Sequence, residues 1–266
     1  MGKSIVITSG KGGVGKTTTT ANLGAGLAAL GQRVALIDAD IGLRNLDIFM
    51  GLENRIVYTL VDVTDERTPW KKALVKDKRF GTNLVLLPSA QTKDKTAVTP
   101  DQMRRLVSEI KQEYDFVLID CPAGIEQGFK NATAGADQAI VVVNPEVPSV
   151  RDADRVIGLL EAEGINEIQV IVNRLKPALV KRGEMLETKD VVELLAVKLL
   201  GVVPDDERVI IATNRGEPIV LDQSTRAGQA YRKIARRMTG EHVPITEWQD
   251  DNSFFSRLKK LVGLGF

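Results

Sequence analysis

The chain has 266 residues, of which 43% are hydrophobic, and its 36 basic residues nearly balance 35 acidic ones. This length allows one sizeable α/β core, while the balanced charge gives no general attraction to nucleic acid, so no nucleic-acid partner is expected. A single cysteine, Cys121, excludes an internal disulfide and favours a cytoplasmic location, and no run approaches the 18 apolar residues of a membrane-spanning helix.

A glycine-rich loop follows the first expected strand, at residues 3–8. It consists of Gly10, Lys11, Gly12, Gly13, Val14, Gly15, Lys16 and Thr17. It matches G-x-x-x-x-G-K-[ST], in which backbone N–H groups surround phosphate oxygens, the lysine reaches the β and γ phosphates, and the hydroxyl binds Mg²⁺. A helix expected from Thr18 to residue 30 turns its N-terminus toward the phosphates. The loop therefore predicts a nucleotide and Mg²⁺, with these eight residues and Thr18 binding the nucleotide.

Lys11 is a second cation in a loop whose general pattern needs only Lys16. Two ammonium groups so close repel each other unless an anion lies between them, although Lys11 could also be a solvated loop lysine. The double-lysine loop resembles that of the deviant-Walker-A ATPases, with the pattern K-G-G-x-G-K-[ST]. In that family the first lysine reaches the nucleotide of the partner subunit. The resemblance implies that Lys11 makes hydrolysis depend on dimerisation.

Short apolar runs alternate with helical stretches along the rest of the chain. Strands are expected at residues 33–37, 83–87, 115–119, 138–143, 168–172 and 199–203, and helices at 100–113, 149–163, 189–197 and 225–239. This alternation indicates an α/β fold of the P-loop NTPase type, with a mostly parallel twisted sheet and helices on both faces. Functional residues are expected just after the strands, where ligands of such sheets bind.

Two aspartates follow expected strands beside the loop. Asp120 and Asp38 are expected to hold Mg²⁺ through water, together with the hydroxyl of Thr17, although either aspartate could simply cap a turn. Cys121 follows Asp120 where many P-loop ATPases carry a glutamate base. Asp40 is therefore the candidate that orients or deprotonates the attacking water, as the matching aspartate does in the resembling family. The expected catalytic residues are Lys11, Lys16 and Asp40.

The base site is expected after two later strands. The sequence contains no Asn-Lys-x-Asp guanine signature, which favours ATP over GTP. At the positions where the resembling family contacts adenine, this chain has Asn173, Arg174, Pro204, Asp205 and Asp206. Asparagine and proline are also ordinary turn residues at strand ends.

The end of the chain has a different composition. After a domain at residues 1–240, residues 241–251 show little apolar periodicity and are expected to form a linker. In residues 252–266, an apolar arc of Phe254, Phe255, Leu258, Leu261, Val262 and Phe266 lies opposite a basic one that includes Arg257, Lys259 and Lys260. This pattern predicts an amphipathic helix on the anionic inner face of the cell membrane, or alternatively one docked on its own domain or a partner. Two such helices on one dimer bind a membrane more tightly than one. Attachment is therefore expected to depend on dimerisation and to be reversible.

Together these features resemble the septum-site-determining branch of the deviant-Walker-A ATPases, also through residues 38–47, 83–95, 120–126, 144–155 and 216–218. The resemblance implies an ATP-bound homodimer with slow, Mg²⁺-dependent hydrolysis, which recruits the division inhibitor MinC to the membrane and is stimulated by MinE. It assigns partner or dimer contacts to Arg44, Asn45, Glu126, Glu146, Arg151, Asp152 and Asp154. The charges near residue 152 could instead be a solvated helix face. A DNA-partition ATPase and a flagellar-number-regulating ATPase remain alternatives.

Overall fold

A computed structural model describes residues 1–94 and 97–249 of the chain. The predicted membrane helix at residues 252–266 lies outside the described residues, and so does Lys95 of the 83–95 motif. Among the described residues, no helix is long and apolar enough to cross a membrane.

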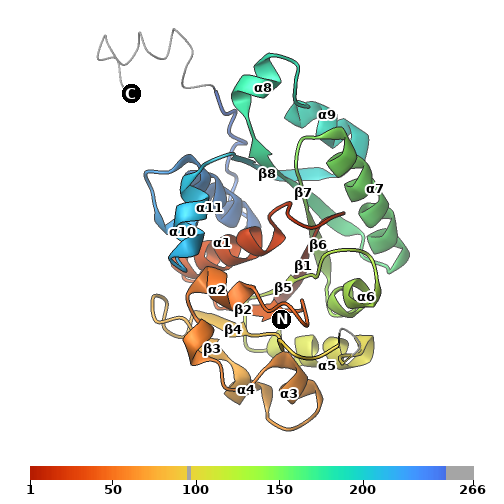
Figure 1. Cartoon of the computed structure of the whole chain (residues 1–266), viewed down its shortest axis with the longest axis vertical. Helices are drawn as coiled ribbons and strands as arrows, with labels where there is room; N and C mark the ends of the chain where they lie inside the picture. The colour runs from red at the N-terminus through yellow and green to blue at the C-terminus, as the bar shows by residue number, and fades with distance from the viewer. Residues whose placement is uncertain (95–96, 250–266) are drawn as a thin grey trace.

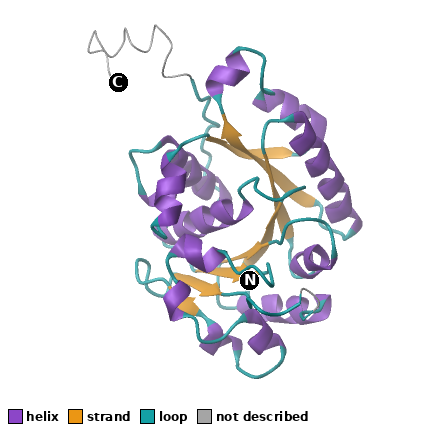
Figure 2. Ribbon diagram, in the orientation of Figure 1, coloured by secondary structure: helices purple, strands orange, loops and turns teal. Residues whose placement is uncertain are grey.

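An eight-stranded sheet runs through the centre of the molecule (Figure 2), in the order β3-β4-β2-β5-β1-β6-β7-β8. Neighbouring strands are parallel except for the edge pair of β3 and β4. The bounds are β1 Lys3–Thr8, β2 Val34–Asp38, β3 Val75–Lys76, β4 Leu84–Leu87, β5 Phe116–Asp120, β6 Gln138–Val143, β7 Glu167–Leu175 and β8 Lys198–Pro204. The predicted, mostly parallel sheet is confirmed.

Helices cover both faces of this sheet (Figure 1). The α-helices are α1 Lys16–Ala29, α2 Leu46–Met50, α3 Leu60–Thr64, α4 Trp70–Ala73, α5 Pro100–Ile110, α6 Gln127–Thr133, α7 Val147–Ala162, α8 Pro177–Lys181, α9 Thr188–Leu195, α10 Arg208–Asn214 and α11 Arg226–Met238. Two 3₁₀ turns, η1 Glu53–Arg55 and η2 Ile219–Leu221, complete the described elements. The five helices expected from periodicity are present, and their ends differ from prediction by a few residues.

Strand alternation divides the core into two layers. Ile5 and Ile7 of β1 pack in the layer that contains α1 and α11, and Val6 between them packs in the layer that contains α5, α6 and α7. Both faces of a covered parallel sheet are apolar, which explains why the strands read as continuous apolar runs. The chain goes from β1 to β2 on one side, and β6 lies on the other side of β1. This reversal places a ligand crevice at the carboxyl end of β1.

Strand β7 extends further than predicted, to Leu175. Its pairing with β8 shifts register between Val172 and Leu175, and Arg174 within that interval has a φ of +56°. A bulge of this kind inserts an extra residue without ending the strand. Asn173 and Arg174 therefore lie within a strand end rather than in the loop after it.

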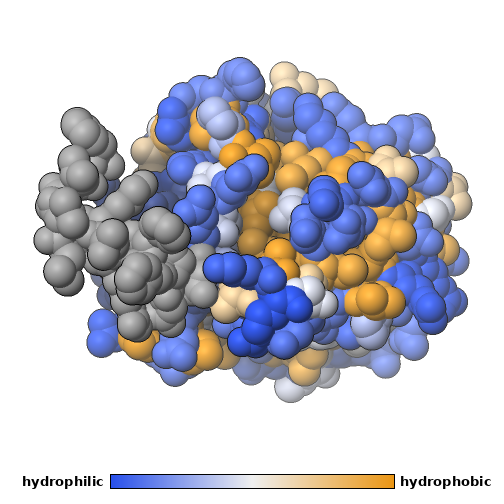
Figure 3. Space-filling model, turned by 90° about the horizontal axis from the view of Figure 1, so that it is seen from above, coloured by the Kyte–Doolittle hydropathy of each residue, from blue (hydrophilic) through white to orange (hydrophobic). Residues whose placement is uncertain are grey.

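Residues 241–249, expected to be a linker, have no regular secondary structure but pack against β8 and α11. The Arg237 guanidinium donates to the carbonyl oxygens of Leu200, Val243 and Pro244 at 2.9, 2.7 and 2.6 Å. The Trp248 Nε1–H donates to the Val202 carbonyl at 3.0 Å. Ile245 and Trp248 border a hollow of about 650 Å³ beside α9. Figure 3 views the molecule from above and shows apolar residues gathered on that face. We refer to residues 241–249 as the strap.

Candidate active site

The glycine-rich loop, residues 10–17, connects β1 to α1. Gly13 and Gly15 have φ angles of +77° and +104°, which side chains rarely tolerate. Gly15 also has no room for a side chain, because a Cβ atom there would lie 2.4 Å from Nδ2 of Asn173. The Asn173 amide in turn donates to the carbonyl oxygen of Val14 at 2.8 Å. Asn173 of β7 thus supports the loop through its contacts with Val14 and Gly15, and we call this contact the buttress.

The two lysines of the loop have opposite environments. Lys16 is 8% exposed, and its Nζ lies 3.2 Å from Oγ of Ser9. The Ser9 hydroxyl donates to the carbonyl oxygen of Lys11 at 2.7 Å. Lys11 itself is exposed. One cation is therefore held inside the loop of its own subunit, and the other is presented at the surface.

Helix α1 begins at Lys16 without a side-chain N-cap. The first N–H groups of a helix have no partner within the helix, and the helix dipole adds partial positive charge there. Together with Lys16 and the loop glycines, this end of α1 forms an anion site of the kind that phosphate groups fill. The residues present therefore fit the phosphate groups of a nucleotide.

Asp38 and Asp120 end neighbouring strands and are paired in register. Asp120 accepts a hydrogen bond from the Thr20 hydroxyl at 3.0 Å. The two Asp38 oxygens accept from the backbone N–H groups of Asp40 and Leu46, at 3.0 and 3.2 Å. Asp38 thus fixes the loop that carries Asp40. The predicted juxtaposition of the two strand-end carboxylates is present.

The electrostatics of this pair suit a divalent cation. Burial raises the pKa of Asp38, and the charge of Asp120 raises it further. Burial also raises the pKa of Asp120, against the Thr17 hydrogen bond and the charge of Lys16. A cation at this edge would favour both ionised carboxylates. Among the described residues there is no cluster of three or more His, Cys, Asp or Glu side chains that could hold a metal. Mg²⁺ usually keeps several waters and binds substrate phosphates, so phosphate, water and Thr17 could supply its other ligands here.

A cavity of about 440 Å³ continues from the loop between the ends of β7 and β8. Seven of the predicted nucleotide-binding residues line it: Gly15, Thr18, Asn173, Arg174, Pro204, Asp205 and Asp206. An ion pair of Lys176 with Asp205, at 3.5 Å, joins two of its walls. The structure therefore brings the predicted base residues and the phosphate loop into one continuous site. We refer to this cavity as the base cavity, after that prediction.

The predicted partner residues occupy several places around this site. Asp152 of α7 packs directly on Gly10, whereas Arg151 and Asp154 are exposed on the same helix. Arg44, at a φ of +44°, forms an ion pair with the buried Asp47 at 3.0 Å. Asn45 precedes α2, Glu126 borders a hollow with Leu43, and Glu146 lines the base cavity.

Several residues of the site carried no sequence signal. Tyr231 of α11 lines the base cavity, and its hydroxyl lies 3.2 Å from Oγ1 of Thr19. Leu179 and Met185 supply apolar surface to the same cavity. They come from distant segments and resemble ordinary core residues, so only the fold reveals them. Burial raises the pKa of Cys121 to about 12, so its thiol stays protonated. Cys121 is therefore a packing residue.

A phosphate loop at a topological switch point, two strand-end aspartates and an adjoining base cavity define a P-loop nucleotide-binding protein. The family model of the CobQ/CobB/MinD/ParA nucleotide binding domain matches residues 5–219. The chain is 57% identical over 266 residues to the septum site-determining protein MinD of Bacillus subtilis, and the alignment covers 99% of each chain.

Solved structures agree with this match. The chain resembles the MinD in a MinC:MinD cell division protein complex from Aquifex aeolicus, with 53% identity, a TM-score of 0.86, and coverage of 93% of this chain and 100% of that chain. It also resembles MinD complexed with Mg-ADP from Pyrococcus horikoshii, with 31% identity, a TM-score of 0.82, and coverage of 90% and 96%. The chain belongs to the MinD septum-site-determining ATPases of the CobQ/CobB/MinD/ParA family.

Proposed function

We propose that this cell-division ATPase is a membrane switch: Mg²⁺ and ATP pair two subunits, the pair holds MinC at the membrane, and slow hydrolysis separates it. The observation that carries the proposal is the difference between the two loop lysines. Lys16 is buried and hydrogen-bonded within its subunit, while Lys11 is exposed on the same loop. An exposed cation beside a phosphate site is suited to act on the nucleotide of a neighbour.

Each residue of the site then has a chemical task. Lys16 and the N–H groups at the start of α1 would hold the phosphates. Thr17, Asp38 and Asp120 would hold Mg²⁺, the aspartates through water, and Asp40 would orient the attacking water. Bound Mg²⁺ would offset charge on the transferring phosphoryl group. Lys11 of the second subunit would complete that charge compensation, as an arginine finger does. A single subunit would therefore hydrolyse ATP very slowly.

Helix α7 is the proposed surface for partner proteins. Its exposed Arg151 and Asp154 flank Asp152, which touches the first glycine of the phosphate loop. The MinC:MinD complex of the Aquifex relative, at 53% identity, supports MinC as one partner. MinE is proposed as the second partner, which stimulates hydrolysis and releases the dimer.

The basic surface of α11 bears on the DNA-partition alternative. Arg237 binds three backbone carbonyls, Lys233 lies 2.7 Å from the Thr246 hydroxyl, and Arg236 pairs with Glu241. These three cations contact the chain's own backbone and side chains rather than forming a free stripe for phosphates. This favours membrane attachment through residues 252–266 over DNA binding.

Vesicle sedimentation tests the proposed function. Full-length protein should sediment with anionic vesicles in ATP and remain in solution in ADP. Leu258→Glu, on the apolar arc, should abolish sedimentation, while Ser256→Glu, which adds the same charge on the polar arc, should reduce it far less. If the Leu258→Glu protein still sedimented with vesicles in ATP, the proposal that residues 252–266 bind the membrane would be wrong. DNA binding at physiological salt that rises with ATP would instead favour partition.

A further inference from the structure

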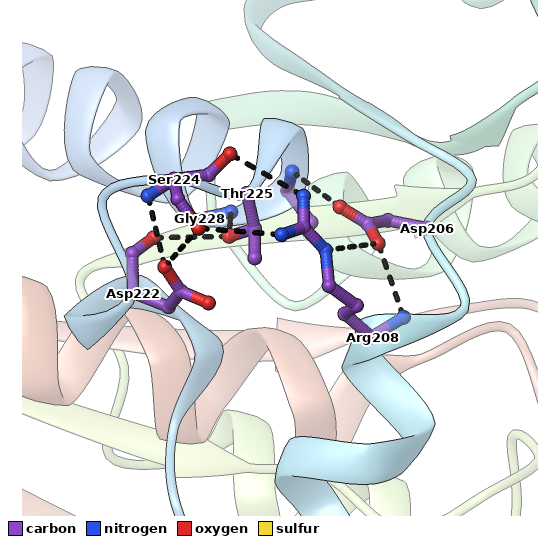
Figure 4. A network of polar contacts seen from close by, with 7 residues as sticks. Asp206, Arg208, Asp222, Ser224, Thr225 and Gly228 are labelled. Atoms are coloured by element: carbon purple, nitrogen blue, oxygen red, sulfur yellow. Dashed lines mark hydrogen bonds and ion pairs between the residues drawn. The ribbon is translucent and has the colours of Figure 1, made fainter.

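We propose that Arg208 is a positioning residue that sets the width of the base cavity, an inference that rests on the proposed assignment of that cavity to the ATP base. Two of the walls of this cavity bear on the proposal. One is the segment from Pro204 to residue 207, and the other is α11, through Tyr231. Arg208 lies at the junction between them (Figure 4).

Asp206 holds the first wall. Its Oδ1 accepts from the backbone N–H of Arg208 at 3.0 Å, and its Oδ2 lies 3.4 Å from the backbone nitrogen of Ala227 in α11. The Arg208 Nε lies 3.5 Å from Oδ1 of the same carboxylate. The carboxylate of Asp206 thus contacts both walls.

The other end of the Arg208 fork binds the turn before α11. Its Nη1 donates to Oγ of Ser224 at 3.2 Å and its Nη2 to the Ser224 carbonyl at 3.3 Å. Asp222 accepts from the Ser224 backbone N–H and hydroxyl, both at 2.8 Å. Thr225 then caps α11 by accepting from the Gly228 N–H at 3.0 Å. A planar guanidinium is suited to this two-sided contact, which an ammonium group cannot reproduce.

This clamp, consisting of Asp206, Arg208 and the turn at residues 222–225, links a cavity wall to the start of α11. Farther along α11, Tyr231 lines the cavity and contacts Thr19 of α1, the helix that follows the phosphate loop. Pro204 and Asp205 are also held by β7, since the Asp205 N–H donates to the Leu175 carbonyl at 2.9 Å. Without the clamp, the rest of this wall, at residues 206 and 207, would be held less firmly and would have to gain order when a base binds. Ordering a loop on binding lowers affinity, so the clamp should raise affinity for the base but not for the phosphates.

Binding of ATP and of inorganic tripolyphosphate to the full-length protein separates these contributions. We expect Arg208→Ala to weaken ATP binding about tenfold, on the scale of lost charged hydrogen bonds, and to leave tripolyphosphate binding unchanged. Arg208→Lys should lose less, in the same direction, and it carries the test if the alanine variant fails to fold. Arg215→Ala is the matched control, because this exposed arginine lies at the other end of α10 and outside the clamp.

Two results would overturn the proposal. A folded Arg208 variant that keeps the wild-type ratio of the two affinities would show that the clamp does not position the base site. Equal loss of both ligands would show general damage instead. If the cavity does not bind the ATP base, the result is different again: wild-type protein would then bind tripolyphosphate as tightly as ATP.

Discussion

Gly10, the first residue of the phosphate loop, lies directly against Asp152 of α7. A Cβ atom on Gly10 would stand 2.3 Å from the Cβ of Asp152 and 2.6 Å from its carbonyl oxygen. The contact includes backbone atoms of α7, so there is no room for a side chain between the loop and the helix. The helix that carries the proposed partner surface is therefore in direct contact with the loop proposed to bind phosphate.

Gly10→Ala tests this contact. The added methyl group forces the loop away from α7, at a cost of about 1–3 kcal/mol for an overpacked site. We expect a lower melting temperature and weaker ATP binding. Gly12→Ala is the control for the melting temperature, because the nearest neighbour of its added methyl group would be the Cβ of Ala123, at an ordinary 3.7 Å. Equal melting temperatures for the two variants would contradict the close packing.

Asn173→Asp tests the buttress behind the loop. The Asn173 amide donates to the Val14 carbonyl, and Asn173 is only 5% exposed. A carboxylate there would face a carbonyl oxygen without a proton to donate, at a cost of about 1–3 kcal/mol or more for an unsatisfied buried group. Calorimetry with ATP should show weaker binding, and thermal unfolding a lower midpoint. Wild-type ATP affinity and a wild-type unfolding midpoint would show that Asn173 does not support the loop.

Much of the fold and site could be predicted because the signals were local. The motif from Gly10 to Thr17 and the apolar runs before Asp38 and Asp120 predicted a loop after the first strand and aspartates at the ends of two others, and the structure has them there. The bulge near Arg174 depends on how β7 pairs with β8, which no local pattern encodes. Helix α10 has seven residues, none of them fully buried, and only Val209 and Ala212 pack partly against the core, which is too short a pattern to predict a helix.

The strap provides another prediction. Trp248→Phe keeps an aromatic ring but removes the donor to the Val202 carbonyl, so the free energy of unfolding should fall by about 1 kcal/mol. Trp248→Ala should cost more, because it also uncovers the apolar hollow beside α9. Urea unfolding of the full-length variants measures both. Two variants as stable as the wild type would show that the strap does not contribute to stability.

A mixing experiment tests the cross-subunit role of Lys11 most directly. With MinE and anionic vesicles, the Lys11→Ala and Asp40→Ala proteins should each be nearly inactive in ATP hydrolysis. A mixed dimer holds one complete site, in which the Asp40→Ala subunit supplies Lys11 to the nucleotide of its neighbour. An equal mixture should regain about a quarter of wild-type activity, since half of randomly paired dimers are mixed and each has one complete site of two.

Lys16→Ala mixed with Asp40→Ala is the control and should regain nothing, because Lys16 is buried within its own loop and is proposed to serve its own nucleotide. We expect recovery in the mixture with Lys11→Ala but not in the mixture with Lys16→Ala. A Lys11→Ala mixture that stays as inactive as the single variants, or a Lys11→Ala protein as active as the wild type, would contradict it.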